Sequence, residues 1–388
     1  MTAFPTQEAP PAIGDRPGNR PDVVLLATLI ALAAIGLLMI FSATRVQNVA
    51  ENLPASFSME RQLIFVAAGL IAYLVASLID YREYRHFAPH IYLGLLALLG
   101  LVFMFAPING ARRWIDLGFF ALQPSEFAKL AVVLAIAVVL APARTEGLGW
   151  GRLGRTLAIV GLPASVVFLQ PDLGTTLVFA FVALVMLFAA GASVRQTLFL
   201  IGGAAGAVYL VMKLGLLSDF QMNRLRVLLD PRNVDPTGIG FQLSQSKLAI
   251  GAGQLFGKGL FQGTQTNFSW VPEQDTDFIF TAVAEQLGFV GGILVIAAFL
   301  VVVWRLLVIA RSARDRYGAL VAVGVAAIVV FHVFVNVGMT MGIMPVTGVP
   351  LPFISSGGSS FIAFAFALGV ANSVWLRRSP VPGETYIL

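Results

Sequence analysis

Two aspartates stand where a long polar segment meets an apolar run of membrane length. Asp275 and Asp277 lie in Trp-Val-Pro-Glu-Gln-Asp-Thr-Asp-Phe-Ile-Phe, residues 270–280, and uninterrupted apolar sequence begins at Phe278. A carboxylate at a bilayer boundary is costly to bury, so one that is held there is a candidate for function. Acid–base chemistry is what such a group could do, and the alternative is that both are solvated residues at the end of a loop.

A charged pair lies at the start of another apolar segment, in Gln-Pro-Ser-Glu-Phe-Ala-Lys, residues 123–129. The proline and the acid that follows it favour the first turn of a helix. Glu126 and Lys129 are three residues apart and therefore share one helical face. They could grip or position a polar substrate in a cavity, or they could be an ion pair that only holds helices together.

Asp172 follows a proline in the tight connection Gln-Pro-Asp-Leu-Gly-Thr-Thr, residues 170–176. Proline and glycine mark a turn here, and the carboxylate can cap the next helix through its first-turn amides. An acid that lines a cavity is the alternative interpretation. The sequence does not decide between the cap and the cavity-lining acid.

The polar segment of residues 217–277 carries basic residues, amide side chains and many glycines. Its glycine and lysine spacing does not match Gly-x4-Gly-Lys-Ser/Thr, which excludes a nucleotide P-loop. The remaining groups suit a pyrophosphate and sugar hydroxyls, although a well-solvated loop would look similar. The candidate binding residues of this segment are Arg224, Arg226, Gln245 and Lys258.

A second irregular segment, residues 344–360, combines closely spaced prolines and glycines with serines that include Ser356 and Ser359. This composition cannot continue a lipid-facing helix, and irregular backbone at membrane depth survives only against protein or a polar cavity. The segment is therefore expected to form part of a cavity wall, unless it is an ordinary outer turn.

Composition identifies the kind of protein that must position these groups. The chain has 388 residues, of which 58% are hydrophobic and 12% are charged, and its mean hydropathy is +0.85. Soluble domains usually carry about twice that fraction of charge, so this is an integral membrane protein. The absence of cysteine excludes disulfides and thiolate chemistry. The formal charge of +5 is explained by cytoplasmic loops and does not indicate nucleic-acid binding.

The sequence predicts an all-α polytopic membrane protein of about ten transmembrane helices, with a long extracytoplasmic loop between the seventh and the eighth. The predicted spans are 23–42, 62–79, 88–106, 126–141, 157–169, 173–192, 197–214, 278–304, 317–342 and 358–376. The fifth is short for a span. Residues 1–20 are Pro-rich and polar and are expected to form a disordered tail ahead of a membrane domain of residues 21–378, with 379–388 as a second tail.

The short loops set the orientation. Arginines concentrate in alternate loops, and the positive-inside rule then places both termini in the cytoplasm. The same assignment places the loop of about residues 217–277 outside.

Four ordered motifs carry a resemblance to a known family. They are residues 123–129, residues 170–176, residues 272–280 with 284–288, and residues 345–360. Together they resemble the SEDS proteins of shape, elongation, division and sporulation, over nearly the whole chain after residue 20. The run Pro-Val-Thr-Gly-Val-Pro-Leu-Pro-Phe, residues 345–353, is similar to the elongation (RodA) branch rather than to the division (FtsW) branch. The family usually has His at the position of Asp275 and Tyr at that of Ser356.

The resemblance implies a peptidoglycan glycosyltransferase that polymerises lipid II at the outer face of the bacterial cytoplasmic membrane during cell elongation. The family's catalytic aspartate matches Asp277, which would accept a proton from the acceptor hydroxyl. An inverting mechanism needs such a base, and it needs cations at the departing pyrophosphate. Lys129, Arg112 or Arg113, and Arg224 or Arg226 would supply that charge. A divalent ion, Mg²⁺ or Mn²⁺, could contribute, and the sequence does not decide this.

The resemblance also implies partners: a class B penicillin-binding protein, which is a transpeptidase with one transmembrane helix, and other membrane proteins of the elongation machinery. Small residues in the last two spans make these the expected docking face, with packing inside the bundle as the alternative.

Other functions remain open on the residues. Charged residues within spans would also suit a transporter of lipid II, whose sites lie at broken helices. A division-type polymerase and a non-catalytic scaffold are further alternatives.

Overall fold

The computed structural model describes residues 20–107, 111–118, 120–142, 148–215, 221–224 and 238–378. The first half of the chain forms α1 (Val23–Ala50), α2 (Phe57–Leu78), α3 (Tyr81–Leu101) with the 3-10 turn η1 (Val102–Met104), a hairpin of β1 (Ile115–Asp116) and β2 (Ala121–Leu122), α4 (Pro124–Leu140), α5 (Trp150–Leu169), α6 (Leu173–Ala189) and α7 (Val194–Lys213). The second half forms α9 (Ile239–Ala252), α10 (Thr264–Asn267), α11 (Ile279–Ser312), α12 (Arg316–Met341) and α13 (Gly358–Leu376).

Long apolar helices dominate the structure. Within the described residues, eight helices are long and apolar enough to cross a membrane. Two further apolar helices of the bundle, α4 and α6, have 17 residues each. The fold class predicted from sequence is therefore confirmed: this is an all-α, multi-pass membrane protein.

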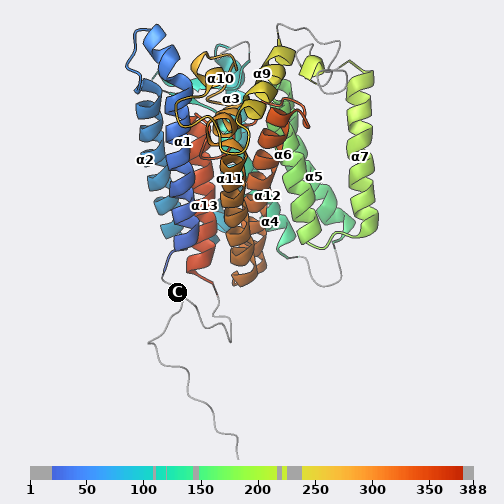
Figure 1. Cartoon of the computed structure of the whole chain (residues 1–388). Helices are drawn as coiled ribbons and strands as arrows, with labels where there is room; N and C mark the ends of the chain where they lie inside the picture. Colours follow the sequence, from blue (N-terminus) through green and yellow to red (C-terminus); the bar gives the residue numbers. More distant parts are fainter. Residues whose placement is uncertain are drawn as a thin grey trace, which may run out of the picture.

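The helices stand side by side, with α9 and α10 across one end of the bundle (Figure 1). In the most apolar stretches of α12 and α13, 72% of the residues are buried, whereas in that of α7 only 6% are. Figure 1 accordingly shows α7 at the edge, apart from its neighbours. The small residues of α13 that were expected to receive a partner, Ala363, Ala365 and Ala367, are buried inside the bundle. The docking-face prediction for that helix was wrong, and packing within the bundle explains those residues.

Several helices begin where a polar side chain satisfies first-turn amides, which otherwise have no partner inside the helix. Asp22 accepts from Leu25 at the start of α1, and Asp315 accepts from the Gly318 amide at the start of α12. Asp22 also connects α1 to α13. Its backbone amide donates to Asn372 Oδ1 of α13 at 3.0 Å. The beginning of α1 and the end of α13 therefore lie at the same end of the bundle.

The fifth predicted span was too short. The fifth segment was expected to cover only residues 157–169, but α5 begins at Trp150 and has 20 residues, enough to cross a bilayer. Arg152 and Arg155 lie in its first turns rather than in a loop. Long basic side chains can extend from a helix end toward water, so their charge does not end the helix.

The polar segment after α7 has structure of its own where it is described. It forms α9 and α10, and a small apolar cluster packs α9 onto α12. The buried members of that cluster are Ala249, Val271, Phe278, Met339 and Val346. Residues 238–277 are therefore not a merely solvated connection.

Helix α11 is broken near its start. Gly288 has φ +69°, which a residue with a side chain rarely adopts. The carbonyls of Glu285 and Gln286 accept from the amides of Lys258 and Gly259 at 3.0 and 3.1 Å. Across the break, the amides of residues 289 and 290 donate to the carbonyls of residues 254 and 255 at 2.9 and 3.1 Å. The irregular backbone is thus satisfied by protein, as a membrane environment requires.

Candidate active site

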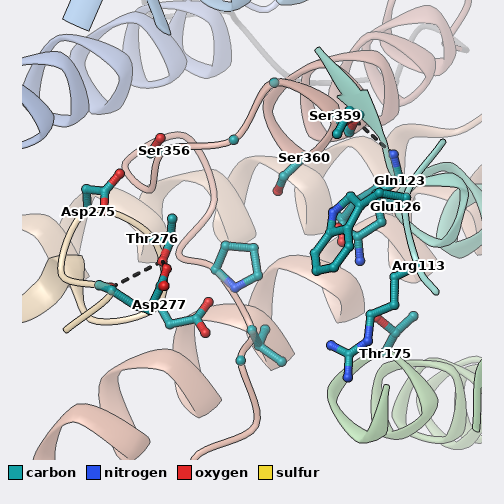
Figure 2. Close-up of a pocket in the computed structure, with 18 of the residues that line it drawn as sticks. Arg113, Gln123, Glu126, Thr175, Asp275, Thr276, Asp277, Ser356, Ser359 and Ser360 are labelled. Atoms are coloured by element: carbon teal, nitrogen blue, oxygen red, sulfur yellow. Dashed lines mark hydrogen bonds between the residues drawn. The ribbon is translucent and has the colours of Figure 1, made fainter. Parts of the chain in front are cut away.

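A cavity of about 880 Å³ lies where α2, α4, α6 and α13 begin, next to the segment that precedes α11. Its walls come from parts of the chain that are far apart in sequence. The segments that contribute are residues 57–65, 111–129, 171–175, 273–277 and 348–360, with Arg224 and His332. Figure 2 shows Asp275 and Asp277 on one side and Arg113 and Thr175 on the other. All four sequence motifs therefore meet at one site.

Asp277 precedes α11 and lines the cavity. Its backbone is held from two directions. Asn336 of α12 donates from Nδ2 to the Asp277 carbonyl at 2.8 Å, and Ser355 Oγ donates to the carbonyl of Thr276 at 2.6 Å. The polypeptide around the carboxylate is thereby fixed while the carboxylate itself faces the cavity.

Burial raises the pKa of Asp277 to about 6, while the nearby Arg224 guanidinium opposes the rise and Glu273 adds to it. The carboxylate is therefore mostly ionised at neutral pH and yet basic enough to accept a proton readily. A catalytic base works best when its pKa lies near the operating pH.

Gly348 explains how the backbone comes so close to this group. Its φ is +73°, and a Cβ placed there would lie 3.2 Å from Oδ2 of Asp277 and 3.6 Å from Nη1 of Arg224. Both the conformation and the close approach favour glycine. The carboxylate and the guanidinium consequently lie against the same short stretch of backbone.

The α5–α6 turn supplies the opposite wall. Arg113 donates from Nε to the Gln170 carbonyl at 3.0 Å and from Nη2 to the carbonyl of Pro171. Asp172 accepts from both the amide and the hydroxyl of Thr175, each at 3.0 Å, and it also lines the cavity. Both hypotheses for Asp172 are therefore correct: it caps α6, and it lies in the cavity wall.

Lys129 is buried in the cavity wall with three neighbours. Its Nζ is 2.7 Å from Glu126 Oε1 and 2.9 Å from Nε2 of His332, and it lies over the Phe364 ring. Nδ1 of His332 is 2.9 Å from the carbonyl of Ile328, so this nitrogen carries the proton and Nε2 accepts from the lysine. The predicted Glu126–Lys129 pair is confirmed, with a histidine as an additional partner.

The 344–360 segment lines the cavity, as expected. The amide of Ser356 donates to the carbonyl of Asp275 at 2.8 Å. Ser359 Oγ donates to the Ala121 carbonyl at 3.0 Å and accepts from the Gln123 amide at 3.1 Å. Ser359 therefore connects the start of α13 to the β1–β2 hairpin, which is a structural task for a predicted binding residue.

Some predicted binding residues are not brought to the cavity. Arg112 is exposed and donates to the Phe103 carbonyl at 3.2 Å. Gln245 lies on α9 and is not part of the cavity lining. Lys258 lies beside Glu285, with Nζ 3.8 Å from Oε1, next to the break in α11. Substrate binding by these three residues stays a prediction, and Arg226 lies outside the described residues.

His332 and Asn336 were missed. They are four residues apart on α12 and therefore share a face, in a span that is otherwise almost wholly apolar. Polar residues inside a membrane span are candidates for function, so this spacing was the signal that could have found them. The cavity-lining Arg61 and Trp114 carried no comparable signal.

In the described part of the chain, no group of three or more histidine and acidic side chains is arranged to hold a metal ion. A divalent cation stays a prediction. The side chains that are present can accept a proton and bind an anionic group. The Asp277 carboxylate, with its raised pKa, faces the same cavity as Arg113, Arg224 and Lys129.

Comparisons with known proteins identify the family of this chain. A family model described as a cell cycle protein and named for FtsW, RodA and SpoVE matches residues 22–379. The chain is 37% identical over 370 residues to a probable peptidoglycan glycosyltransferase FtsW of Trichlorobacter lovleyi, covering 94% of this chain and 96% of the relative. It is 38% identical over 365 residues to the peptidoglycan glycosyltransferase MrdB of Escherichia coli, covering 92% and 94%.

Solved structures are similar over the same length. One, described as showing the structural coordination of polymerization and crosslinking by a peptidoglycan synthase complex, has a TM-score of 0.77 at 30% identity and covers 93% of this chain and 99% of that one. The rod shape determining protein RodA of Thermus thermophilus has a TM-score of 0.67 at 29% identity and covers 92% and 97%. With a family match over nearly its whole length, the chain belongs to the FtsW/RodA/SpoVE family, the SEDS proteins.

Proposed function

We propose that the cavity is the active site at which this peptidoglycan glycosyltransferase polymerises lipid II, the undecaprenyl-pyrophosphate-linked disaccharide pentapeptide. The observation that carries the proposal is the position of Asp277. Its carboxylate lines a cavity of about 880 Å³ beside Arg224, and burial raises its pKa to about 6.

In the proposed reaction, Asp277 accepts the proton of the acceptor 4-hydroxyl as that oxygen attacks the anomeric carbon of the donor. A carbon–oxygen bond forms to the acceptor, the bond from the anomeric carbon to the pyrophosphate oxygen breaks, and undecaprenyl pyrophosphate leaves. A single attack from the opposite face turns the α-linked donor into a β-1,4 link. One base suffices because inversion requires no second, nucleophilic carboxylate.

Cationic side chains would neutralise the charge that develops on the departing pyrophosphate. Arg113 and Arg224 line the cavity and carry planar guanidinium groups that match phosphate oxygens. Lys129 lies in the same wall, where Glu126 and His332 hold its ammonium group. A divalent ion, if bound, would add charge neutralisation at the phosphates.

The cavity faces the outer side of the cytoplasmic membrane in this proposal, with both termini in the cytoplasm. The support is the distribution of arginines in the short loops. The end of the bundle with α9, α10 and the cavity is then the outer end.

Cell elongation is the proposed setting. The support is the run of residues 345–353, which resembles the elongation branch, whereas relatives named MrdB and FtsW are about equally similar, at 38% and 37% identity. A class B penicillin-binding protein is the proposed partner. A similar solved structure is described as coordinating polymerization and crosslinking within a synthase complex, and crosslinking is the chemistry of a transpeptidase.

Reconstitution tests the proposal against transport. Purified protein in liposomes, with and without a class B penicillin-binding protein, is given lipid II, and both glycan chain length and movement of lipid II between leaflets are measured. The expected result is glycan polymer without translocation. Translocation without polymer would identify a transporter instead, and neither activity with the partner present would overturn the proposal.

A further inference from the structure

Asn336 is a fully buried asparagine on α12, at 0% exposure. Its Nδ2 donates two hydrogen bonds, to the carbonyl of Asp277 and to the carbonyl of Val349, both at 2.8 Å. Carbonyl oxygens only accept, so the atom that faces them is the amide nitrogen with its two protons. One side chain therefore bonds two chain segments that are more than 70 residues apart in sequence.

The two segments form the immediate surroundings of the Asp277 carboxylate. One contains Asp277 itself. The other contains Gly348, where a Cβ would lie 3.2 Å from Oδ2 of Asp277. The hydrogen bonds of Asn336 thus set the separation of the carboxylate from the backbone that it faces.

The Asn336 side chain comes from a well-buried helix. The most apolar stretch of α12 is 72% buried, and His332, one turn before Asn336, contacts Lys129. Functional groups keep a productive geometry when such second-layer hydrogen bonds on regular elements support them. By contrast, residues 273–278 and 346–353 lie outside the helices, in turns and irregular backbone.

We propose that Asn336 is a positioning residue for Asp277: its side-chain amide holds the base and the Gly348–Val349 backbone at a fixed separation. This inference rests on the proposed function of Asp277 as the base. It predicts that loss of the amide lowers the rate of the chemical step while lipid II still binds, since a displacement of about 1 Å can cost about 100-fold in rate.

The test compares Asn336→Leu, which keeps the size and removes the donor, with Asn336→Ser, which keeps a shorter donor. The expected kcat for lipid II polymerisation falls at least about tenfold for Asn336→Leu and less for Asn336→Ser, with KM within about twofold of wild type. Hydrogen exchange of the substrate-free protein, followed by mass spectrometry, is expected to rise in peptides covering 272–278 and 346–352.

Asn372→Leu is the matched control. Asn372 is also a buried asparagine with two side-chain hydrogen bonds, to Ser77 and to the amide of Asp22, but it lies at the other end of the bundle. Its substitution should lower the melting temperature without changing kcat or the exchange of those two peptides.

Three outcomes decide the matter. A kcat near wild type for Asn336→Leu overturns the positioning role, and so does a loss of kcat with unchanged exchange in both peptides. If Asn336→Leu does not fold, the same two criteria apply to Asn336→Ser. If wild-type protein makes no polymer while exchange still rises in the variants, the proposed function fails and the hydrogen-bonded connection stands.

Discussion

Two acids near the start of α11 differ in how the protein holds their carboxylates, one fully buried and the other half-buried. Glu285 is 0% exposed, and its oxygens accept from the amides of Gln265 and Thr266 at 2.8 and 3.0 Å and from the Thr266 hydroxyl at 2.7 Å. Asp277 is held instead through its backbone carbonyl, and its carboxylate lines the cavity. A carboxylate whose oxygens are all engaged by fixed donors stabilises a fold, whereas one that faces a cavity can exchange a proton with a substrate.

The largest effect is expected at Asp277. Asp277→Asn keeps the size and removes the base, so polymerisation should fall by about two to four orders of magnitude, the usual contribution of a general base. The measurement is glycan synthesis from lipid II by reconstituted protein at matched membrane content. Asp275→Asn is the neighbouring control and should retain most of the rate. If that variant is the inactive one, the base has been assigned to the wrong aspartate.

Glu126 and Lys129 share a feature with each of these acids. They line the cavity, as Asp277 does, but they are paired with each other, as Glu285 is with its donors. Either single neutralisation leaves a buried charge without its partner, at a cost of about 3–5 kcal/mol in stability. The double exchange Glu126→Lys with Lys129→Glu should recover much of the yield of folded protein but not polymerisation, because the cation has moved away from His332. Recovery of both yield and rate would show that the pair is only structural.

At Glu285 the expected effect is on stability alone. Glu285→Gln replaces a charged acceptor and turns one oxygen into a donor that faces other donors, which should cost about 1–3 kcal/mol. Thermal unfolding of purified protein measures the loss, and the rate per folded molecule should remain near wild type. A Glu285→Gln variant that is fully stable but inactive would contradict the purely structural role of Glu285.

The smallest effect concerns pH. Burial raises the pKa of Asp277 to about 6, so kcat/KM should fall about tenfold per pH unit below that value, as the base becomes protonated. The raised pKa also means that the folded state favours the protonated form. The associated stability is present at low pH and is lost as pH rises through about 6.

Asp277→Asn should therefore raise the melting temperature slightly near neutral pH, and the gain should vanish toward pH 4 or so. Glu285→Gln should lower it in the same buffers. Thermal unfolding of the two variants at several pH values checks both signs together, and a fall for Asp277→Asn at neutral pH would contradict the raised pKa.

The fold was largely predictable because long apolar runs have few alternatives in a membrane protein. Each of the ten predicted segments overlaps one of α1 to α7 or α11 to α13. Helix ends were less predictable where charged residues lie inside the first turns, as Arg152 does in α5. Helix α9 was missed because its glycines and amide side chains are equally typical of a loop.

The site was predictable only in part. Asp277 and the Glu126–Lys129 pair stand in motifs whose charges interrupt apolar sequence, and the structure brings them to one cavity. The charge of Lys258 suggested substrate binding equally well, but its location beside Glu285 follows from the break in α11, which spacing does not reveal. Asn336 acts through contacts with two distant carbonyls, and such contacts exist only in three dimensions.

The hydrogen bonds between the first and last thirds of the chain have a consequence for biosynthesis. The amide of Asp22 is bonded to Asn372, and that of Gln123 to Ser359. Ribosomes make the early partner of each pair hundreds of residues before the late one. The cavity is therefore incomplete until α13 has entered the bilayer. A nascent chain that stalls before α13 would insert its earlier helices without an assembled site.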